Sequence, residues 1–336
     1  MPENFTLITG SIKTGVFTYL LSTRLGIIYL INLSILKYST MKMKSLLKEN
    51  QKSIALVVGN GVNLYGQARN TNSWIDLLVR LAKEHLPSEL TEVPKGISLT
   101  EFYDVLDLKA TSDDSRRSLQ KEFCELMEEW KPYDHHRHIV NWAKSANAPI
   151  LTTNFESTLS DAGGCSLYRT KKGGFTDFYP WENYFGVNQI NKPGDGFGVW
   201  HVNGTQHYHR SVRLGLSQYM GSVQRARGWL HQGGEALFSG IDVERWYGAR
   251  SWLNIIFTRP LLIFGLSLEE NEVFLRWLLI ERALYFKKFP ERKKKAWYVY
   301  SGNKNSDGKQ YFLKGVGVEP VHVRDFDDIY SQSIWV

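Results

Sequence analysis

Cysteine is nearly absent from this chain: its 336 residues include only Cys124 and Cys165. A cysteine zinc ribbon needs four thiolates in paired C-x-x-C spacing, so the sequence excludes that class of metal site. Two cysteines allow one disulfide, but nothing in their spacing requires it. Such low cysteine usage is typical of a reducing compartment. We therefore expect a cytoplasmic protein with no zinc module and no bound metal.

The sequence also lacks long runs of one charge. The net charge is +7 and the pI is about 9.1, yet the basic residues are spread along the chain. Only Arg292–Lys295 forms a basic run, which we interpret as a solvated turn before a strand. No zinc-finger or arginine-rich nucleic-acid module is recognisable, so we expect no specific nucleic-acid partner. The mild basicity suits smaller anionic partners such as nucleotides.

Long apolar runs are equally rare, and the one exception covers residues 15–36. It is long enough for a membrane span of roughly 20 residues, but Arg24 at its centre costs about 2.5–3.5 kcal/mol on insertion scales. Three interpretations of residues 1–50 stay open: a membrane anchor, an amphipathic or oligomer-forming helix, or an extension upstream of a start at Met41 or Met43. No small-residue cleavage site follows the run, which disfavours a secretory signal.

Short apolar runs that alternate with helical periods dominate the rest of the chain. Hydrophobic residues make up 43% and charged residues 22%, as in a globular protein with a sizeable core. The expected strands cover residues 54–58, 149–152, 198–202, 260–264, 296–300 and 318–323, with a further short edge strand at 211–215. Pro320 makes the last long strand an edge strand. This alternation predicts an α/β fold, a Rossmann-like parallel sheet with helices on both faces.

The expected helices cover residues 73–85, 98–147, 222–238 and 271–288, the third broken at Gly228 and at Gly233-Gly234. Ser73 is the predicted N-cap of the first helix, and its apolar face is predicted to comprise Ile75, Leu78, Val79 and Ala82. Residues 163–198 show no clear period and are interpreted as loops over a pocket. The domain organisation that follows is an extension, residues 1–50, and one domain, residues 51–336, with a helical insertion at about 98–147.

Three histidines, His135, His136 and His138, invite a metal interpretation. Their spacing fits neither one helix face at i, i+4 nor a known ligand set. We therefore expect them to be surface residues at the start of a helix.

Four of the expected strands end in polar or glycine-bearing tips: Gly59-Asn60-Gly61, Thr153-Asn154, His201-Val202-Asn203-Gly204 and Gly265-Leu266-Ser267. In an open parallel sheet, ligands bind beyond the carboxyl ends of the strands. The first tip is a glycine turn that tolerates φ > 0, after which backbone N–H groups can face an anion. The convergence of four such tips predicts a nucleotide site at this edge of the sheet.

The segments GNGVN, TTNFE, WHVNGT and LLIFGLSL occur in this order between about residues 53 and 289. In order and rough spacing they resemble the motifs of the sirtuin-like (silent information regulator) superfamily. The resemblance is greatest to its bacterial branch of NAD-consuming antiphage defence effectors. It implies a Rossmann-like domain that binds NAD.

The resemblance implies a role for each tip. Gly59, Asn60, Gly61 and Asn63 resemble the loop that cradles the pyrophosphate and ribose of NAD. Thr153 and Asn154 resemble the element at the nicotinamide ribose, with Asn154 placing the attacking water. His201 resembles the catalytic histidine, and the cofactor-binding residues further include Asn203, Gly204, Gly265, Ser267 and Leu268.

The histidine position departs from the family pattern. The family histidine usually directly precedes the glycine, whereas here Asn203 does so and His201 lies two residues earlier. Residues i and i+2 of a strand point to the same face, so His201 could reach the same cavity. A pocket that is inactive or differently built stays open as the alternative.

The function that the resemblance implies is hydrolysis of NAD to ADP-ribose and nicotinamide by an antiphage, abortive-infection effector. An amide such as Asn154 can donate and accept hydrogen bonds without adding charge, and an imidazole can act as general base near neutral pH. Such effectors often need a homo-oligomer or an activating partner protein. The alternatives are a sirtuin-type deacylase or ADP-ribosyltransferase, which the missing zinc module disfavours, and a non-catalytic NAD-binding subunit.

Overall fold

The computed structural model describes residues 42–67, 72–86, 90–110, 118–170, 179–269, 272–302 and 307–336. The chain divides into two units, Met1–Tyr38 and Ser39–Val336, and all described residues belong to the second. The apolar run at residues 15–36 therefore lies outside the described residues, as do residues 111–117 of the expected insertion. Within the described part, no helix is both long and apolar enough to cross a membrane.

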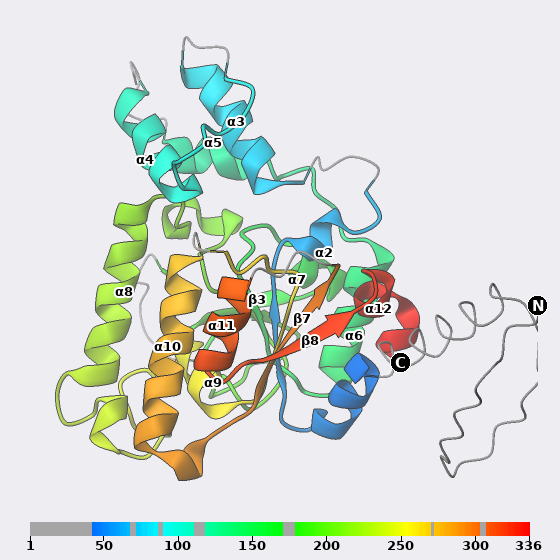
Figure 1. The fold of residues 1–336 in the computed structure, drawn as a ribbon, viewed down its shortest axis with the longest axis vertical. Helices are drawn as coiled ribbons and strands as arrows, with labels where there is room; N and C mark the ends of the chain where they lie inside the picture. The colour runs from blue at the N-terminus through cyan, green and yellow to red at the C-terminus, as the bar shows by residue number, and fades with distance from the viewer. Residues whose placement is uncertain are drawn as a thin grey trace, which may run out of the picture. The chain divides into compact units, whose positions relative to one another are not determined.

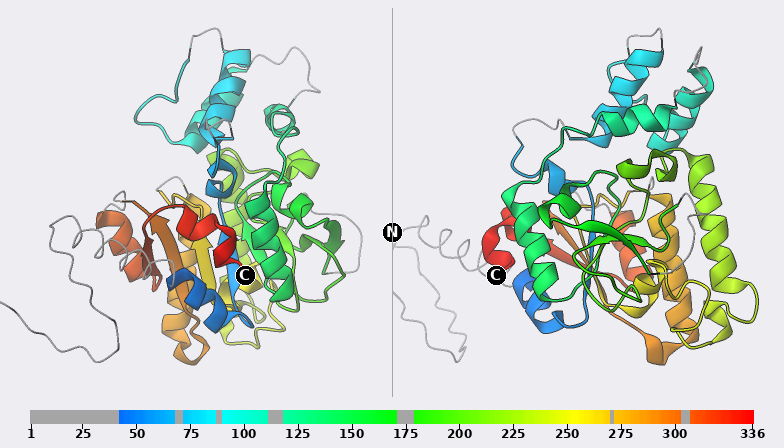
Figure 2. Two further views of the ribbon diagram at one scale, coloured as in Figure 1. Left: turned by 90° about the vertical axis from the view of Figure 1, so that its right-hand side faces the viewer. Right: turned by 180° about the vertical axis from the view of Figure 1, so that it is seen from behind.

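A sheet of eight strands forms the centre of the described unit (Figures 1 and 2). The strand order is β3-β4-β5-β2-β1-β6-β7-β8. The six neighbouring strands β5, β2, β1, β6, β7 and β8 are parallel to one another. β3 and β4 extend one end of the sheet in antiparallel pairing. The bounds are β1 Ala55–Val58, β2 Ile150–Thr152, β3 Ser166–Arg169, β4 Asn183–Gly186, β5 Val199–His201, β6 Leu261–Phe264, β7 Ala296–Ser301 and β8 Glu319–Val323.

The helices of the described residues connect these strands. They are α2 Gly61–Leu64, α3 Trp74–His85, α4 Leu99–Lys109, α5 Leu119–Glu125, α6 Asp134–Ser145, α7 Thr158–Ala162, α8 Leu216–His231, α9 Leu253–Thr258, α10 Val273–Lys288, α11 Asp307–Gly315 and α12 Asp327–Tyr330, with 3-10 turns η1 Gln206–Ser211, η2 Leu237–Ser239, η3 Pro290–Arg292 and η4 Gln332–Ile334. Residues 42–50 are helical as well.

Helices cover both faces of the sheet, which confirms the predicted Rossmann-like α/β fold. In β1, Ala55 and Val57 belong to an apolar cluster shared with α8, α9 and α10, while Leu56 and Val58 belong to a second cluster shared with α6 and α12. Figure 1 shows α8 and α10 on one side of the sheet and α6 and α12 on the other. A strand buried on both faces is a continuous apolar run, which is why the central strands could be predicted.

The six strands predicted within residues 54–58, 149–152, 198–202, 260–264, 296–300 and 318–323 are confirmed, and β8 lies at the edge of the sheet as Pro320 indicated. Two other expectations about strands were wrong. The aperiodic segment 163–198 contains β3 and β4, and residues 211–215 form no strand. Val212 and Leu214 are nevertheless buried, because they pack against the helical cluster of α3, α4 and α5. The alternation of apolar and polar residues in the segment 211–215 therefore results from packing against these helices and not from pairing in the sheet.

Two expectations about helices also need correction. α8 runs through Gly228 without the predicted break, but it does end before Gly233-Gly234 as predicted, and the φ of Gly233 is +86°. α3 begins after Ser73 as predicted, and Ser73 Oγ accepts a hydrogen bond from the Ile75 N–H at 3.2 Å. Of the predicted apolar face, Leu78, Val79 and Ala82 are buried, which confirms them. Ile75 is 47% exposed, and Leu77 and Leu81 belong to the buried face in its place.

The domain limits differ from those that the sequence suggested. Met43 and Leu47, on the helix over residues 42–50, are buried in the core, so the compact unit begins before residue 51. α3, α4 and α5 share an apolar cluster of their own and project from the sheet at the top of Figure 1. α6 instead packs on the sheet, so the helical insertion does not extend to residue 147.

Candidate functional site

The chain reverses its direction of winding at β1, because β2 lies on one side of β1 and β6 on the other. Such a switch point opens a crevice at the carboxyl ends of the strands, where ligands of α/β proteins bind. A cavity of about 430 Å³ lies there, and we call it the large cavity. Five residues predicted from the sequence line it: Asn60, Gly61, Thr153, Gly265 and Ser267. Its volume falls within the usual range for small-molecule sites.

The glycines of the first loop allow two loops to pack closely. A Cβ atom on Gly59 would lie 2.4 Å from Leu266 Cγ, and one on Gly61 would lie 2.8 Å from Gly265 Cα. Gly265 itself has φ +70°, but neither Gly59 nor Gly61 has a positive φ. The glycines of this turn are therefore not required by a positive φ, contrary to our expectation. The Gly61 N–H donates to the Gly265 carbonyl at 2.7 Å, so that group does not face the cavity as a free donor.

Asn60 and Asn63 continue this loop as a hydrogen-bonded pair. Asn63 Nδ2 donates to Asn60 Oδ1 at 2.8 Å, and Asn60 Nδ2 donates to the Asn72 carbonyl at 2.7 Å. The Asn60 side chain therefore fastens the entry to α3. Asn63 is buried, and its Nδ2 also donates to Glu156 Oε1 at 2.9 Å. Asn63 thus links the glycine loop to the segment that follows β2.

Two of the three histidines of α6 contact the glycine loop and α2 through hydrogen bonds, whereas we expected all three at the surface. His135 Nε2 lies 2.7 Å from the Val62 carbonyl, and His136 Nε2 lies 3.1 Å from Asn63 Oδ1. Both histidines are buried, whereas His138 is partly exposed. Burial lowers the pKa of both buried imidazoles, that of His136 to about 3. They are therefore neutral and act as structural hydrogen-bond partners of α2.

Glu156 is a buried carboxyl group that the sequence argument did not assign to the site. Its Oε1 lies within hydrogen-bonding distance of Asn63 Nδ2, of Asn154 Nδ2 at 3.2 Å and of Thr158 Oγ1 at 3.0 Å. Burial raises the pKa of Glu156, although these hydrogen bonds oppose the shift. The only sequence signal was an ionisable residue just after a buried strand. The structure makes Glu156 the centre of a polar network that joins the loops after β1 and β2.

His201 and Asn154 lie together. His201 is the last residue of β5, and its Nδ1 lies 2.8 Å from the Asn154 carbonyl oxygen. Because a carbonyl only accepts, Nδ1 carries the proton and Nε2 carries the lone pair. Burial lowers the pKa of His201 to about 4, so the imidazole is neutral near pH 7. Nε2 is buried and has no hydrogen-bond partner among the described residues.

His201 lines a second cavity, of about 100 Å³, which we call the small cavity. Its other lining residues are mainly apolar or aromatic: Leu167, Pro180, Asn183, Phe185, Thr205, His207, Tyr208 and Ser211. The ring of Phe185 packs edge-on against His201, with centroids 5.4 Å apart. β3 and β4 thus supply part of the wall of the small cavity. Residues 163–198 were expected to cover a pocket, and these two strands do so, although they are strands and not loops.

The remaining predicted residues lie around these cavities without lining them. Asn203 Nδ2 donates to the Thr153 carbonyl at 3.2 Å, which ties the tip of β5 to that of β2. Gly204 has φ +97°, and a Cβ atom there would lie 2.2 Å from the Ser211 carbonyl oxygen. The Leu268 side chain is fully buried in the apolar core. Asn203 and Gly204 therefore shape the backbone of the site, and Leu268 anchors the loop after β6.

The large cavity also includes residues that the sequence argument missed. Lys309 of α11 donates to the Ser267 carbonyl at 2.7 Å and pairs with Glu269. Tyr298 of β7 donates to the Leu266 carbonyl at 2.7 Å. Burial raises the pKa of Glu272, another lining residue, to about 7. These contacts fasten the loop after β6 from β7 and α11, and they give this side of the cavity ionisable groups.

The two cavities occupy neighbouring parts of one sheet edge. Loops after β1 and β6 and the end of β7 line the large cavity, and the end of β5 lines the small one. β2 lies between β1 and β5, so the segment Thr153–Asn154 that follows it lies between the two cavities. In comparisons with known proteins, no family model and no curated protein matches this chain.

Proposed function

We propose that the protein is an NAD glycohydrolase that cleaves NAD to ADP-ribose and nicotinamide. The observation that carries this proposal is the state of His201: a neutral imidazole that lines a cavity beside the crevice of the sheet, is oriented by the Asn154 carbonyl, and has a buried Nε2 without a hydrogen-bond partner among the described residues. An oriented base beside a crevice at a topological switch point suits chemistry on a bound nucleotide.

The large cavity suits the ADP portion of NAD. Its volume is about 430 Å³, and its walls combine polar atoms of Asn60 and Thr153 with the aromatic rings of Trp74, Tyr298 and Tyr300. Aromatic rings offer stacking surfaces for a base. An extended dinucleotide that begins there would cross the Thr153–Asn154 segment and bring its nicotinamide ribose toward His201.

The proposed reaction breaks the bond between ribose C1′ and the nicotinamide nitrogen, and the electron pair of that bond goes to the nicotinamide ring. A water oxygen then bonds to C1′, and His201 Nε2 accepts the proton that this water loses. A base with a pKa of about 4 is weak, but it is unprotonated throughout the neutral range. It is also sufficient here, because a water oxygen that bonds to an oxocarbenium-like carbon becomes strongly acidic. The Asn154 amide, whose Oδ1 is buried without a partner among the described residues, is the second group we assign to orienting water.

The small cavity favours hydrolysis over deacylation. A volume of about 100 Å³ accommodates a few water molecules but is well below the usual size of sites for larger ligands. The chain also has only two cysteines, so it lacks the four-cysteine module of deacylating sirtuins. His201 is 2% exposed, which supports a resting state that must open before turnover. We propose that assembly into an oligomer or an activating partner supplies that opening in an antiphage effector.

The decisive experiment measures nicotinamide release from NAD by the purified full chain, with and without an acetylated peptide. We expect release that does not need the peptide and that is lost in His201→Gln and Asn154→Ala. His209→Gln is the matched control, because His209 lies in the same chain segment but lines neither cavity. Release that requires peptide would support a deacylase, and NAD binding without release under activating conditions would support a non-catalytic subunit.

A further inference from the structure

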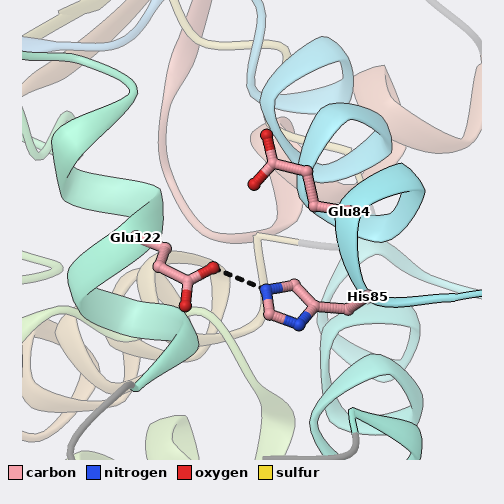
Figure 3. A group of neighbouring side chains, drawn as sticks. All are labelled: Glu84, His85 and Glu122. Atoms are coloured by element: carbon pink, nitrogen blue, oxygen red, sulfur yellow. Dashed lines mark hydrogen bonds and ion pairs between the residues drawn. The ribbon is translucent and has the colours of Figure 1, made fainter.

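Three metal-ligating side chains converge between α3 and α5, away from both cavities (Figure 3). Glu84 and His85 belong to the last turn of α3, and Glu122 belongs to α5. One ligand atom from each side chain lies within 4.8 Å of the others. We propose that these residues bind a divalent transition-metal ion that joins α3 to α5. This proposal is independent of the proposed reaction.

The charges and contacts of the group favour a cation. His85 Nε2 lies 2.5 Å from Glu122 Oε2, while Glu122 Oε1 is buried and has no hydrogen-bond partner among the described residues. A buried carboxylate oxygen without a partner costs free energy, because its lost contacts with water are not replaced. Two carboxylates and a neutral imidazole carry a charge of −2. A divalent ion bound between the three side chains would neutralise that charge.

The donor set indicates which ion. One imidazole nitrogen with two carboxylate groups suits Zn²⁺, Co²⁺ or Mn²⁺ better than Ca²⁺ or Mg²⁺, which bind mainly oxygen. The side chains of His85 and Glu122 are 21% and 15% exposed, and Glu84 is exposed, so water can complete the coordination. Metal-ligand bonds of about 2.0–2.2 Å need ligand atoms about 3 Å or more apart. The ion would therefore replace the hydrogen bond between His85 and Glu122, with the ring proton on Nδ1 so that the Nε2 lone pair can bind the ion, and both side chains would rotate slightly outward.

The proposed ion has a structural consequence for the large cavity. The opposite end of α3 supplies Ser73, Trp74 and Ile75 to the wall of that cavity. α3 has 12 residues and is therefore about 18 Å long, so an ion at its last turn is remote from the bound nucleotide we propose. By fixing α3 to α5, the ion would stabilise one wall of the cavity without taking part in the reaction.

The test is titration of the chelator-treated full chain with CoCl₂, followed by visible absorption, and with ZnCl₂, followed by calorimetry. We expect one ion per chain and a rise in Tm on binding, with no comparable response to MgCl₂. Glu84→Gln, His85→Gln and Glu122→Gln should each weaken binding by about tenfold or more, since changes even to outer-shell partners of a metal cost this much. Glu84 is exposed, so its variant should fold normally even if the other two do not.

His231→Gln is the matched control. His231 Nε2 lies 2.8 Å from Glu281 Oε2 and joins α8 to α10 in a similar histidine-glutamate pair, but that pair belongs to no group of three ligands among the described residues. This variant should bind Co²⁺ as the wild type does. Absence of stoichiometric binding at millimolar Co²⁺ would overturn the proposal, and so would binding that Glu84→Gln and His85→Gln leave unchanged or that His231→Gln abolishes.

Discussion

The Nδ1 atom of His201 and the carbonyl oxygen of Asn154 lie 2.8 Å apart and join the end of β5 to the segment that follows β2. The two strands are hydrogen-bonded neighbours, with Thr152 opposite His201. This contact fixes both the tautomer and the direction of the imidazole, so that Nε2 carries the lone pair. His201 lies three residues before Gly204, and this contact ties its side chain to the tip of β2.

The burial of His201 predicts a dependence of stability on pH. Its pKa falls from about 6.5 in the unfolded chain to about 4 in the native protein. Between these values the unfolded state binds more protons, so the free energy of unfolding decreases as the pH falls from 6.5 to 4. The full effect is roughly 3 kcal/mol. Urea unfolding of wild type and His201→Gln across this range should show a flatter curve for the variant; parallel curves would contradict the buried neutral state.

The same residue predicts a separation of binding from turnover. His201→Gln removes the basic nitrogen, so nicotinamide release should fall by about 10²- to 10⁴-fold. The Kd for NAD should change little, because the residues assigned to the ADP portion line the other cavity. Calorimetry with NAD and a nicotinamide assay measure the two quantities. Equal losses in binding and turnover would show that His201 shapes the pocket and does not act on the substrate.

Glu156 predicts a contrast between two substitutions. Its carboxyl oxygen Oε1 is a shared acceptor for Asn63, Asn154 and Thr158. Glu156→Gln retains an acceptor oxygen, whereas Glu156→Ala leaves buried donors unpaired and should cost about 3 kcal/mol or more. The comparison is made by urea unfolding at neutral pH.

The pH dependence of the Glu156 variants supplies the control. Because the native pKa of Glu156 is raised above 4.5, the native state binds more protons than the unfolded state above that pH, and this stabilisation is lost as the pH rises through the native pKa. Glu156→Gln should remove that loss and equal or exceed the stability of the wild type at neutral pH. If it is as unstable as Glu156→Ala, an ionised carboxylate holds the network together.

The central strands could be predicted because their side chains are buried on both faces, which leaves an unbroken apolar run in the sequence. β3 and β4 could not, since they lie at the end of the sheet, where β3 is largely exposed. The turn after β1 was located correctly, but the reason given for its glycines, tolerance of φ > 0, was wrong. Gly59 and Gly61 are there because another loop packs against them, and a sequence does not reveal which loop will do so.

The buried polar network was missed for a related reason. Asn63 and Glu156 are 93 residues apart in the chain, and His136 lies 73 residues after Asn63. A histidine in the first turn of a helix is usually exposed, and only the docking of α6 under α2 buries this one. The sequence shows where polar residues lie, but it does not show which of them are buried. Their burial and their hydrogen-bond partners are set by the tertiary structure.

The packing of the glycine loop leads to a prediction with an internal control. In Gly61→Ala, the new methyl group would lie 2.8 Å from the Gly265 Cα and 3.0 Å from its carbonyl oxygen, both of which are backbone atoms that cannot rotate away. The loops after β1 and β6 must then separate, at a cost of about 1–3 kcal/mol. Gly221→Ala in α8 meets no atom within 4 Å, so it should stabilise the helix by about 0.5–1 kcal/mol. Tm measurements on the two variants should therefore move in opposite directions, and an unchanged Tm for Gly61→Ala would mean that the two loops are not held in contact.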